Sequence, residues 1–192
     1  MFDFLKKLYL QLRYFRRIEI GKNVVINQIP IFLIDTDSKI IIDDDCIIRD
    51  LVELRATKNS KLQLGKNVKL DRMVRIIATN NNDIIIGDNV RIGIGSVFNG
   101  GGSIYVGNNT LISGYVYLQT SMHNHKGGGD IMNAGYIYGD IRIDEGSWLG
   151  VHAVIFPNVH LGQKTIVGSN AVVNKSFKKN SIIGGIPAKE IK

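Results

Sequence analysis

The stretch from Ile143 to Val173 reads IDEGSW, LGVHAV, IFPNVH, LGQKTI, VGSNAV, with Val173 opening a sixth unit. Each unit of six residues begins with a branched aliphatic residue. A period of six fits neither an α-helix, at about 3.6 residues per turn, nor a strand, at about 2. It fits a prism-shaped coil in which each first residue points inward and Gly, Asn or Asp relieves the corners. Short hexapeptide repeats of this kind predict a parallel β-helix.

The same frame runs back to Ile20, with coils that begin every 22 residues as far as Ile86. We interpret 22 as one coil of 18 residues plus four extra residues that fall at the same corner each time. The polar turn sequences DTDS (35–38), TKNS (57–60) and TNNN (79–82) occupy that corner, as a loop requires. Every hexad start is Ile, Leu, Val or Phe; the starts are residues 20, 26, 42, 48, 54, 64, 70, 76, 86, 92, 98, 106, 112, 118, 143, 149, 155, 161, 167 and 173.

The interval from Val106 to Ile143 is 37 residues, which by count is two coils of 18 plus one residue. The second of these coils shows no clean hexads. We therefore interpret 124–142 as a long loop that replaces a wall of the prism. The predicted organisation is a helix at 1–17, a β-helix domain at 18–181 with this loop, and a C-terminal tail at 182–192.

The length of 192 residues is enough for one sizeable domain. No apolar run approaches the ~20 residues of a membrane span, and no signal-peptide cleavage pattern follows Met1. The single cysteine, Cys46, lies at a small inward position, so we expect a packed core thiol and a reducing compartment. The net charge of +7 permits binding to phosphates or to a membrane surface without choosing between them.

Residues 2–17, FDFLKKLYLQLRYFRR, have the spacing of an amphipathic helix. We favour a cap over the open first coil, whose edge needs covering. The alternative is a helix that lies on an anionic membrane. Basic runs also bind nucleic acid, but no base-reading motif accompanies this one, so we expect no nucleic-acid partner. The apolar residues that share one predicted face are Phe2, Leu5, Leu8, Leu12 and Phe15.

The hexads and the ending IIGGIPAKEIK (182–192) resemble the hexapeptide-repeat acyltransferases, above all the maltose, galactoside and polysaccharide O-acetyltransferases. The most specific part is 143–191, with DEGSWLGVHAVIFPNVHLG, VGSNAVVNK and GGIPAKEI. The resemblance implies an all-β fold, a left-handed parallel β-helix with a short N-terminal α-helix and a protruding loop. It also implies acetyl-CoA as co-substrate and a homotrimer with CoA lying between subunits.

Transfer of acetyl from a thioester to a hydroxyl needs a base, and imidazole titrates in the right range. Thr120 and His123 reproduce the Thr–His spacing of similar sugar acetyltransferases, so His123 is our candidate general base. His125, the second histidine of a His-x-His pair found in polysaccharide-acetylating relatives, is a candidate acceptor contact. We expect His152 and His160 to be solvated surface residues.

A carboxylate or a carbonyl usually orients such a base, and Asp130, Asp140 and loop carbonyls all remain candidates. In similar enzymes an Asn one coil before the histidine serves the acceptor, but the register places Gly93 in that slot. We therefore propose that Asn99 takes the place of this asparagine as the acceptor contact. The implied CoA contacts are Trp148 on the pantetheine arm, main chain at Val151 and Ser169, Asn174 and Lys175 near the adenosine end, and Lys189 and Lys192 near the phosphates.

Three other functions compete with this one. Zinc-dependent β-helix enzymes hold the metal through histidines, two of them separated by four residues, and no His pair here has that spacing, so we expect no metal. A non-catalytic scaffold and N-acetylation of an amino-sugar nucleotide stay open. We predict an O-acetyltransferase that acts on a sugar hydroxyl in surface polysaccharide synthesis, by direct transfer, in the cytoplasm or at the inner face of the membrane.

Overall fold

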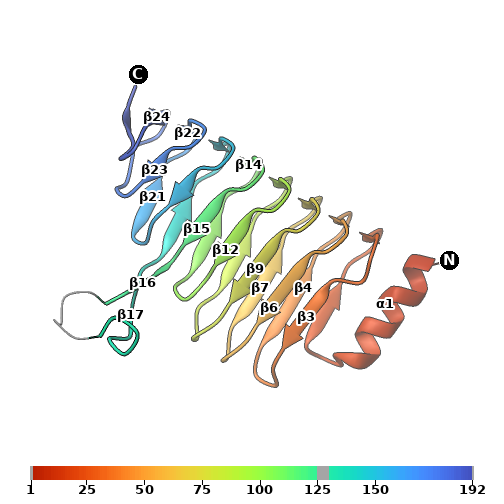
Figure 1. The fold of residues 1–192 in the computed structure, drawn as a ribbon. Coiled ribbons are helices and arrows are strands. Elements are labelled where there is room, and N and C mark those ends of the chain that lie inside the picture. Colours follow the sequence, from red (N-terminus) through yellow and green to blue (C-terminus); the bar gives the residue numbers. More distant parts are fainter. Residues whose placement is uncertain (1, 125–129, 192) are drawn as a thin grey trace.

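The computed structural model describes residues 2–124 and 130–191, which form one β-solenoid behind a single helix, α1 (Phe2–Arg13). Strands stack in parallel along one axis, from α1 at the N-terminal end to β24 at the C-terminal end (Figure 1). The predicted all-β parallel helix with a short N-terminal α-helix and a protruding segment is therefore confirmed.

Each coil contributes one strand to each of three sheets, which form the walls of the prism. The first sheet contains β1 (Ile18–Ile20), β4 (Lys39–Ile42), β7 (Lys61–Leu64), β10 (Ile84–Ile86), β13 (Ile104–Val106), β18 (Ile141–Ile143) and β21 (Val159–Leu161). The second contains β2 (Val25–Ile26), β5 (Ile47–Ile48), β8 (Lys69–Leu70), β11 (Arg91–Ile92), β14 (Leu111–Ile112), β19 (Trp148–Leu149), β22 (Ile166–Val167), β24 (Ile182–Gly184) and β25 (Lys189–Glu190). The third contains β3 (Ile31–Ile34), β6 (Glu53–Ala56), β9 (Arg75–Ala78), β12 (Val97–Asn99), β15 (Tyr117–Gln119), β20 (Val154–Ile155) and β23 (Val172–Val173).

The register between coils joins hexad start to hexad start. Ile42 pairs with Leu64, and Leu64 pairs with Ile86, so the predicted interval of 22 residues is one full coil. All the hexad starts from Ile26 to Val173 are buried, and Ile20 is partly buried against the same core. The apolar residues therefore form one continuous column, which neighbour-to-neighbour stacking stabilises.

The walls meet at three corners, which we number by the sheets that they join: the first corner lies between the first and second sheets, the second between the second and third, and the third between the third sheet of one coil and the first sheet of the next. Asn67 and Asn89 occupy equivalent positions of the first corner with φ of 55° and 59°. Asparagine tolerates this left-handed conformation better than most residues. The Asn67 side-chain amide also donates to Asn89 Oδ1 at 2.9 Å, so the corner residues stack as the strands do.

The predicted role of residues 124–142 as a loop in place of a wall is wrong. Val106 of β13 pairs directly with Ile143 of β18, so no wall is missing between these two coils. The intervening chain instead leaves the third corner as an antiparallel hairpin of β16 (Ser121–His123) and β17 (Tyr136–Tyr138), which projects from the solenoid (Figure 1). The segment that we separated as a tail, 182–192, continues the second sheet in its described part, because β24 pairs with β22 and β25 folds back on β24.

Helix α1 lies at the open end of the first coil, but with a different face from the one that the sequence predicts. Leu10 is buried, whereas Leu5, Leu8 and Leu12 are exposed. The chain ends the helix at Arg13, so Phe15 falls in the following turn and is also exposed.

Polar donors explain why the face of α1 that carries Leu10 turns inward. The Lys6 ammonium donates to the carbonyls of Ile26 and Asn27 at 2.6 and 2.7 Å. The Tyr14 hydroxyl and the Arg17 guanidinium donate to further carbonyls of β3, at 3.2 and 2.9 Å. The first coil has no preceding coil to pair with its backbone groups, and unpaired buried carbonyls are costly. The helix therefore covers the strand edge through hydrogen bonds and leaves its apolar stripe free.

Candidate functional site

His123 is the last residue of β16, two residues out from the start of the projecting hairpin. Its exposed ring lies 4.5 Å, centroid to centroid, from the ring of Tyr136, which is the residue opposite it on β17. The imidazole is therefore accessible from solvent and is held on one side by an aromatic ring. Tyr136 was not among the residues that the sequence predicted, because hairpin pairing is not part of the hexad pattern. His125 lies outside the described residues.

Thr120 ties the hairpin root to the coil below it. Its buried hydroxyl donates to the carbonyl of Asn99 at 2.6 Å and accepts from the backbone N–H groups of Gly101 and Gly102 at 2.6 and 3.0 Å. One donor and two acceptor positions exhaust what a hydroxyl offers. Asn99, the predicted acceptor contact, thus lies one coil below the segment that leads to His123, and its side chain is partly exposed.

The two carboxylates considered as orienting groups have other partners. Asp140 Oδ1 accepts from the backbone N–H of Ser103 at 2.8 Å. Asp130 accepts from the backbone N–H of Met132 and from the Asn133 amide, both at 3.0 Å. Within 2–124 and 130–191, neither aspartate is hydrogen-bonded to His123.

Three of the predicted cofactor contacts lie together on the second sheet and the second corner. Trp148 is 47 % exposed, and its indole N–H donates to Ser113 Oγ at 3.1 Å, which fixes the ring over the coil below. Val151 and Ser169 occupy equivalent corner positions on successive coils and are both exposed. Gly150 allows this close stacking, since a Cβ there would lie 2.6 Å from the Ser169 nitrogen.

The remaining predicted cofactor contacts divide between two edges. Lys189 lies on β25 at the end of the second sheet, beyond Ser169. Asn174 and Lys175 are exposed at the third corner, and the Lys175 ammonium lies 5.5 Å from the centre of the Phe177 ring. Lys192 lies outside the described residues. One chain thus presents two separate groups: the indole face on the second sheet, and the third corner with the candidate base.

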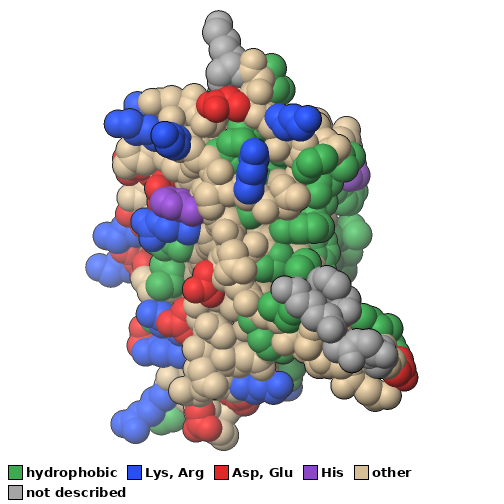
Figure 2. Space-filling model, turned by 90° about the vertical axis from the view of Figure 1, so that its left-hand side faces the viewer, with side chains coloured by type: hydrophobic (Ala, Val, Ile, Leu, Met, Phe, Trp, Pro, Cys, Tyr) green, Lys and Arg blue, Asp and Glu red, His purple; other side chains and the backbone are tan. Residues whose placement is uncertain are grey.

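An apolar flank accompanies the first of these groups. Hydrophobic side chains gather along one side of the molecule, and charged side chains line the other (Figure 2). The exposed apolar residues of the second and third sheets and the corner between them include Leu111, Tyr115, Tyr117, Trp148 and Val151.

The structure gives a steric reason why position 93 is glycine and not the asparagine found in similar enzymes. A Cβ on Gly93 would lie 2.5 Å from the backbone nitrogen of Gly114, so the next coil occupies the space that an asparagine would need. Gly93 lines a shallow groove of about 310 Å³ on the second sheet, together with Lys69, Arg91 and Ser113. The groove therefore offers cations where the resemblance implies an amide.

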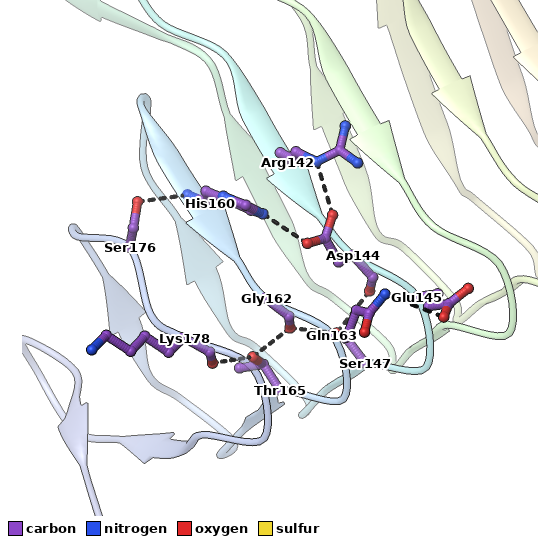
Figure 3. Close-up of polar contacts among 10 residues, drawn as sticks. All are labelled: Arg142, Asp144, Glu145, Ser147, His160, Gly162, Gln163, Thr165, Ser176 and Lys178. Carbon is purple, nitrogen blue, oxygen red and sulfur yellow. Dashed lines mark hydrogen bonds and ion pairs between the residues drawn. The ribbon is translucent and has the colours of Figure 1, made fainter.

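A second polar cluster, which the sequence did not predict, lies on the first sheet. His160 Nε2 is 2.8 Å from Asp144 Oδ2, and Arg142 Nε is 2.8 Å from the other oxygen of that carboxylate (Figure 3). The His160 backbone N–H donates to Ser176 Oγ at 2.9 Å. This cluster borders a cavity of about 570 Å³ near the first corner that Lys178 also lines.

His160 is exposed, as expected, but its imidazole also shares a hydrogen bond with the Asp144 carboxylate. The strand register explains this contact. Arg142 of β18 pairs with His160 of β21, which brings Asp144 within reach of the imidazole.

Cys46 is fully buried, and its thiol donates to the carbonyl of Gly65 at 3.1 Å. Burial raises the pKa of the Cys46 thiol to about 11, so the nucleophilic thiolate is scarce at neutral pH. The predicted packed core thiol is confirmed. Across the described part of the chain, no group of three or more His, Cys, Asp or Glu side chains is placed to hold a metal ion.

No family model matches the chain. Curated relatives do: the chain is 34 % identical over 98 residues to the putative lipopolysaccharide biosynthesis O-acetyl transferase WbbJ of Escherichia coli. That match covers 47 % of this chain and 50 % of WbbJ, so the chain spans about half the length of the curated relatives it matches.

Solved structures agree on the fold. The polySia-specific acetyltransferase NeuO superposes with a TM-score of 0.61 at 24 % identity, over 91 % of this chain and 78 % of that one. A mutant of AntD, an N-acyltransferase from Bacillus cereus in complex with dTDP-4-amino-4,6-dideoxyglucose and coenzyme A, gives 0.69 at 19 % identity, over 100 % and 88 %. The predicted resemblance to the hexapeptide-repeat acyltransferases is therefore confirmed. No helix within 2–124 or 130–191 has the length and apolarity to cross a bilayer.

Proposed function

We propose that this protein is an acetyl-CoA-dependent O-acetyltransferase that acetylates a sugar hydroxyl during surface polysaccharide synthesis. The observation that carries the proposal is the position of His123, an exposed imidazole on the first strand of the only hairpin that leaves the described solenoid. The names of the relatives support it, since WbbJ is described as an O-acetyl transferase of lipopolysaccharide biosynthesis and NeuO as a polySia-specific acetyltransferase.

In the proposed reaction, His123 accepts the hydroxyl proton as the acceptor oxygen attacks the thioester carbonyl. The tetrahedral intermediate then collapses, the bond from carbon to sulfur breaks, and the imidazolium returns the proton to the CoA thiolate. The products are the acetyl ester and free CoA. No acyl-enzyme is needed, which suits a chain whose single thiol, Cys46, is buried with a raised pKa.

In this proposal the site is shared between copies of the chain. Trp148, Val151 and Ser169 lie on the second sheet and second corner, whereas His123 and Lys175 lie at the third corner. A homotrimer would bring the indole face of one subunit against the third corner of its neighbour, with CoA in the groove between them. The exposed apolar flank around Tyr117 and Trp148 is a suitable surface for that contact.

In this arrangement each group of residues would contact a different part of CoA. Trp148 would cover the pantetheine arm, main chain at Val151 and Ser169 would bond its amides, and Asn174 and Lys175 would hold the adenosine end. Lys189 and Lys192 supply mobile positive charges suited to the phosphates. Asn99 and His125 are the proposed acceptor contacts.

N-acetylation of an amino-sugar nucleotide is the second candidate. AntD, whose fold covers the whole of this chain, is described as an N-acyltransferase in complex with such a nucleotide. The groove beside Gly93, with Lys69 and Arg91, has the charge to receive a diphosphate.

One assay separates these functions. Purified full-length protein is given acetyl-CoA and a panel of neutral sugars, amino-sugar nucleotides and lipid-linked glycans, and free thiol is measured. We expect turnover with a hydroxyl acceptor, and mild base should remove the product's acetyl group because it is an ester. A base-stable product would be an amide and would favour the second candidate, and no turnover on any acceptor would favour a non-catalytic scaffold.

The variants His123→Ala and His160→Ala complete the test. If His160→Ala alone abolishes turnover, the pair of His160 with Asp144 supplies the base and the assignment of His123 is wrong.

A further inference from the structure

Helix α1 has two opposite faces with different surroundings. At about 100° per residue, the buried Leu10 stands about 180° from the middle of the stripe formed by Phe4, Leu5, Leu8 and Leu12. Because Leu10 packs against the first coil, this stripe points away from the solenoid. The exposed fractions are 67 % for Phe4, 53 % for Leu5, 42 % for Leu8 and 70 % for Leu12, with Phe15 in the next turn at 70 %.

The stripe is not needed to hold the helix in place. The helix is held by Lys6, on the opposite face, and by Tyr14 and Arg17, which follow the helix. All three donate hydrogen bonds to carbonyls of the first coil. No other part of the described chain covers the apolar side chains. A contiguous apolar surface of this kind on a soluble domain marks a binding surface.

Charge identifies what binds there. Lys7 lies about 60° to one side of Phe4, and Arg13 lies about 40° beyond Tyr9 on the other side of the stripe. Arg16 follows in the exposed turn, and residues 4–17 contain no Asp or Glu. An apolar stripe bordered on both sides by cations is the pattern of a helix that lies in the interface of an anionic bilayer.

We propose that α1 binds an anionic lipid surface, with Phe4, Leu8 and Leu12 inserted among the acyl chains and with Lys7 and Arg13 at the headgroup phosphates. The position of α1 suits this role, because it lies at one end of the solenoid and no other element projects beyond it (Figure 1). The proposal is independent of the proposed catalytic function, since binding is measured without turnover.

A second copy of the chain is a poorer occupant of the stripe. Two α1 helices packed through their stripes would bring Lys7, Arg13 and Arg16 of one copy against the same cations of the other, and residues 4–17 supply no acidic partner. Lipid phosphates neutralise these charges directly.

The test is vesicle flotation of the full-length protein. The vesicles contain phosphatidylcholine alone or phosphatidylcholine with phosphatidylglycerol. We expect binding to the anionic vesicles only, with weaker binding at high salt. The double variant Leu8→Glu/Leu12→Glu should bind at least about tenfold more weakly, because two apolar side chains no longer enter the bilayer. Its thermal unfolding midpoint should match that of the wild type, since both side chains are exposed.

Leu51→Glu is the matched control, because Leu51 is 60 % exposed but lies at the second corner of the second coil and not on α1. It should bind vesicles as the wild type does. Equal binding by the wild type and the double variant would overturn the proposal, as would binding to neither kind of vesicle. A double variant that instead changes the oligomer mass, with no lipid binding by the wild type, would assign the stripe to a second copy.

A labelling experiment decides the matter if the double variant does not fold. Leu12→Cys can be labelled selectively with a polarity-sensitive dye, because Cys46 is fully buried. A blue shift of the dye's emission on addition of anionic vesicles supports insertion, and an unchanged spectrum refutes it.

Discussion

The Thr120 hydroxyl allows a sharp test of how the hairpin root is held. Thr120→Val keeps the shape of the side chain but leaves the buried backbone N–H groups of Gly101 and Gly102 without their acceptor. A buried donor without a partner costs about 1–3 kcal/mol. Two such donors therefore predict a loss of unfolding free energy of about 2–6 kcal/mol, with about 3 kcal/mol as our expectation.

Urea denaturation followed by circular dichroism measures this loss, and a thermal scan should show a midpoint lowered by about 6–12 °C. Thr120→Ser is the control. It keeps the hydroxyl and removes one methyl group, so it should cost only about 1 kcal/mol. If the valine variant is as stable as the wild type while the serine variant is weakened, methyl packing holds the root and the reasoning from hydrogen bonds is wrong.

Three further outcomes are expected. His123→Ala should lower kcat by about 10²–10⁴ while the affinity for acetyl-CoA barely changes, because a positioned base acts only as the proton moves; His160→Ala, measured beside it by thiol release, should retain most of the activity. Lys175→Ala and Lys189→Ala should mainly raise KM for acetyl-CoA, with a smaller effect at high salt, and an unchanged KM in both would remove them from the cofactor site. Deletion of residues 2–17 should lower the thermal midpoint, because the carbonyls of the first coil lose their donors, and an unchanged midpoint would show that the helix does not cap the fold.

The hexad pattern predicted the coils because the side chains that begin each hexad are buried at regular intervals along the solenoid. Every start from Ile26 onward is buried, and the interval of 22 residues matches the strand register. The pattern failed between Val106 and Ile143, where a total of 37 residues happened to fit two coils plus one residue. An inserted hairpin has its own pairing, and its length carries no information about the coil count.

Helix α1 shows a different limit. Periodicity located its apolar stripe, but the usual expectation that the apolar face turns inward was wrong. The first coil offers carbonyls as well as apolar side chains, and Lys6 satisfies two of them. Similarly, the pairing of His160 with Asp144 depends on which strands are neighbours, and the sequence distance of 16 residues gives no direct sign of it.

The candidate cofactor contacts lie on two edges of the solenoid, which matching residues to a family pattern could not predict, because the match suggests a role for each residue but not its position. Trp148 and His123 each match the resemblance, yet the prism places them on different sides of one chain. Local sequence identifies such residues one at a time.

The corners differ in how they tolerate a change of length. Between β1 and β2 the chain uses residues 21–24, and between β19 and β20 it uses 150–153; every connection at the first and second corners is four residues long up to β23. The third corner alone varies, from 156–158 to the 120–140 segment that carries the hairpin. Insertions there leave all three ladders in register. The solenoid thus accepts an insertion of variable length at one corner of each coil, and new segments can be grafted at the third corner without redesign of the core.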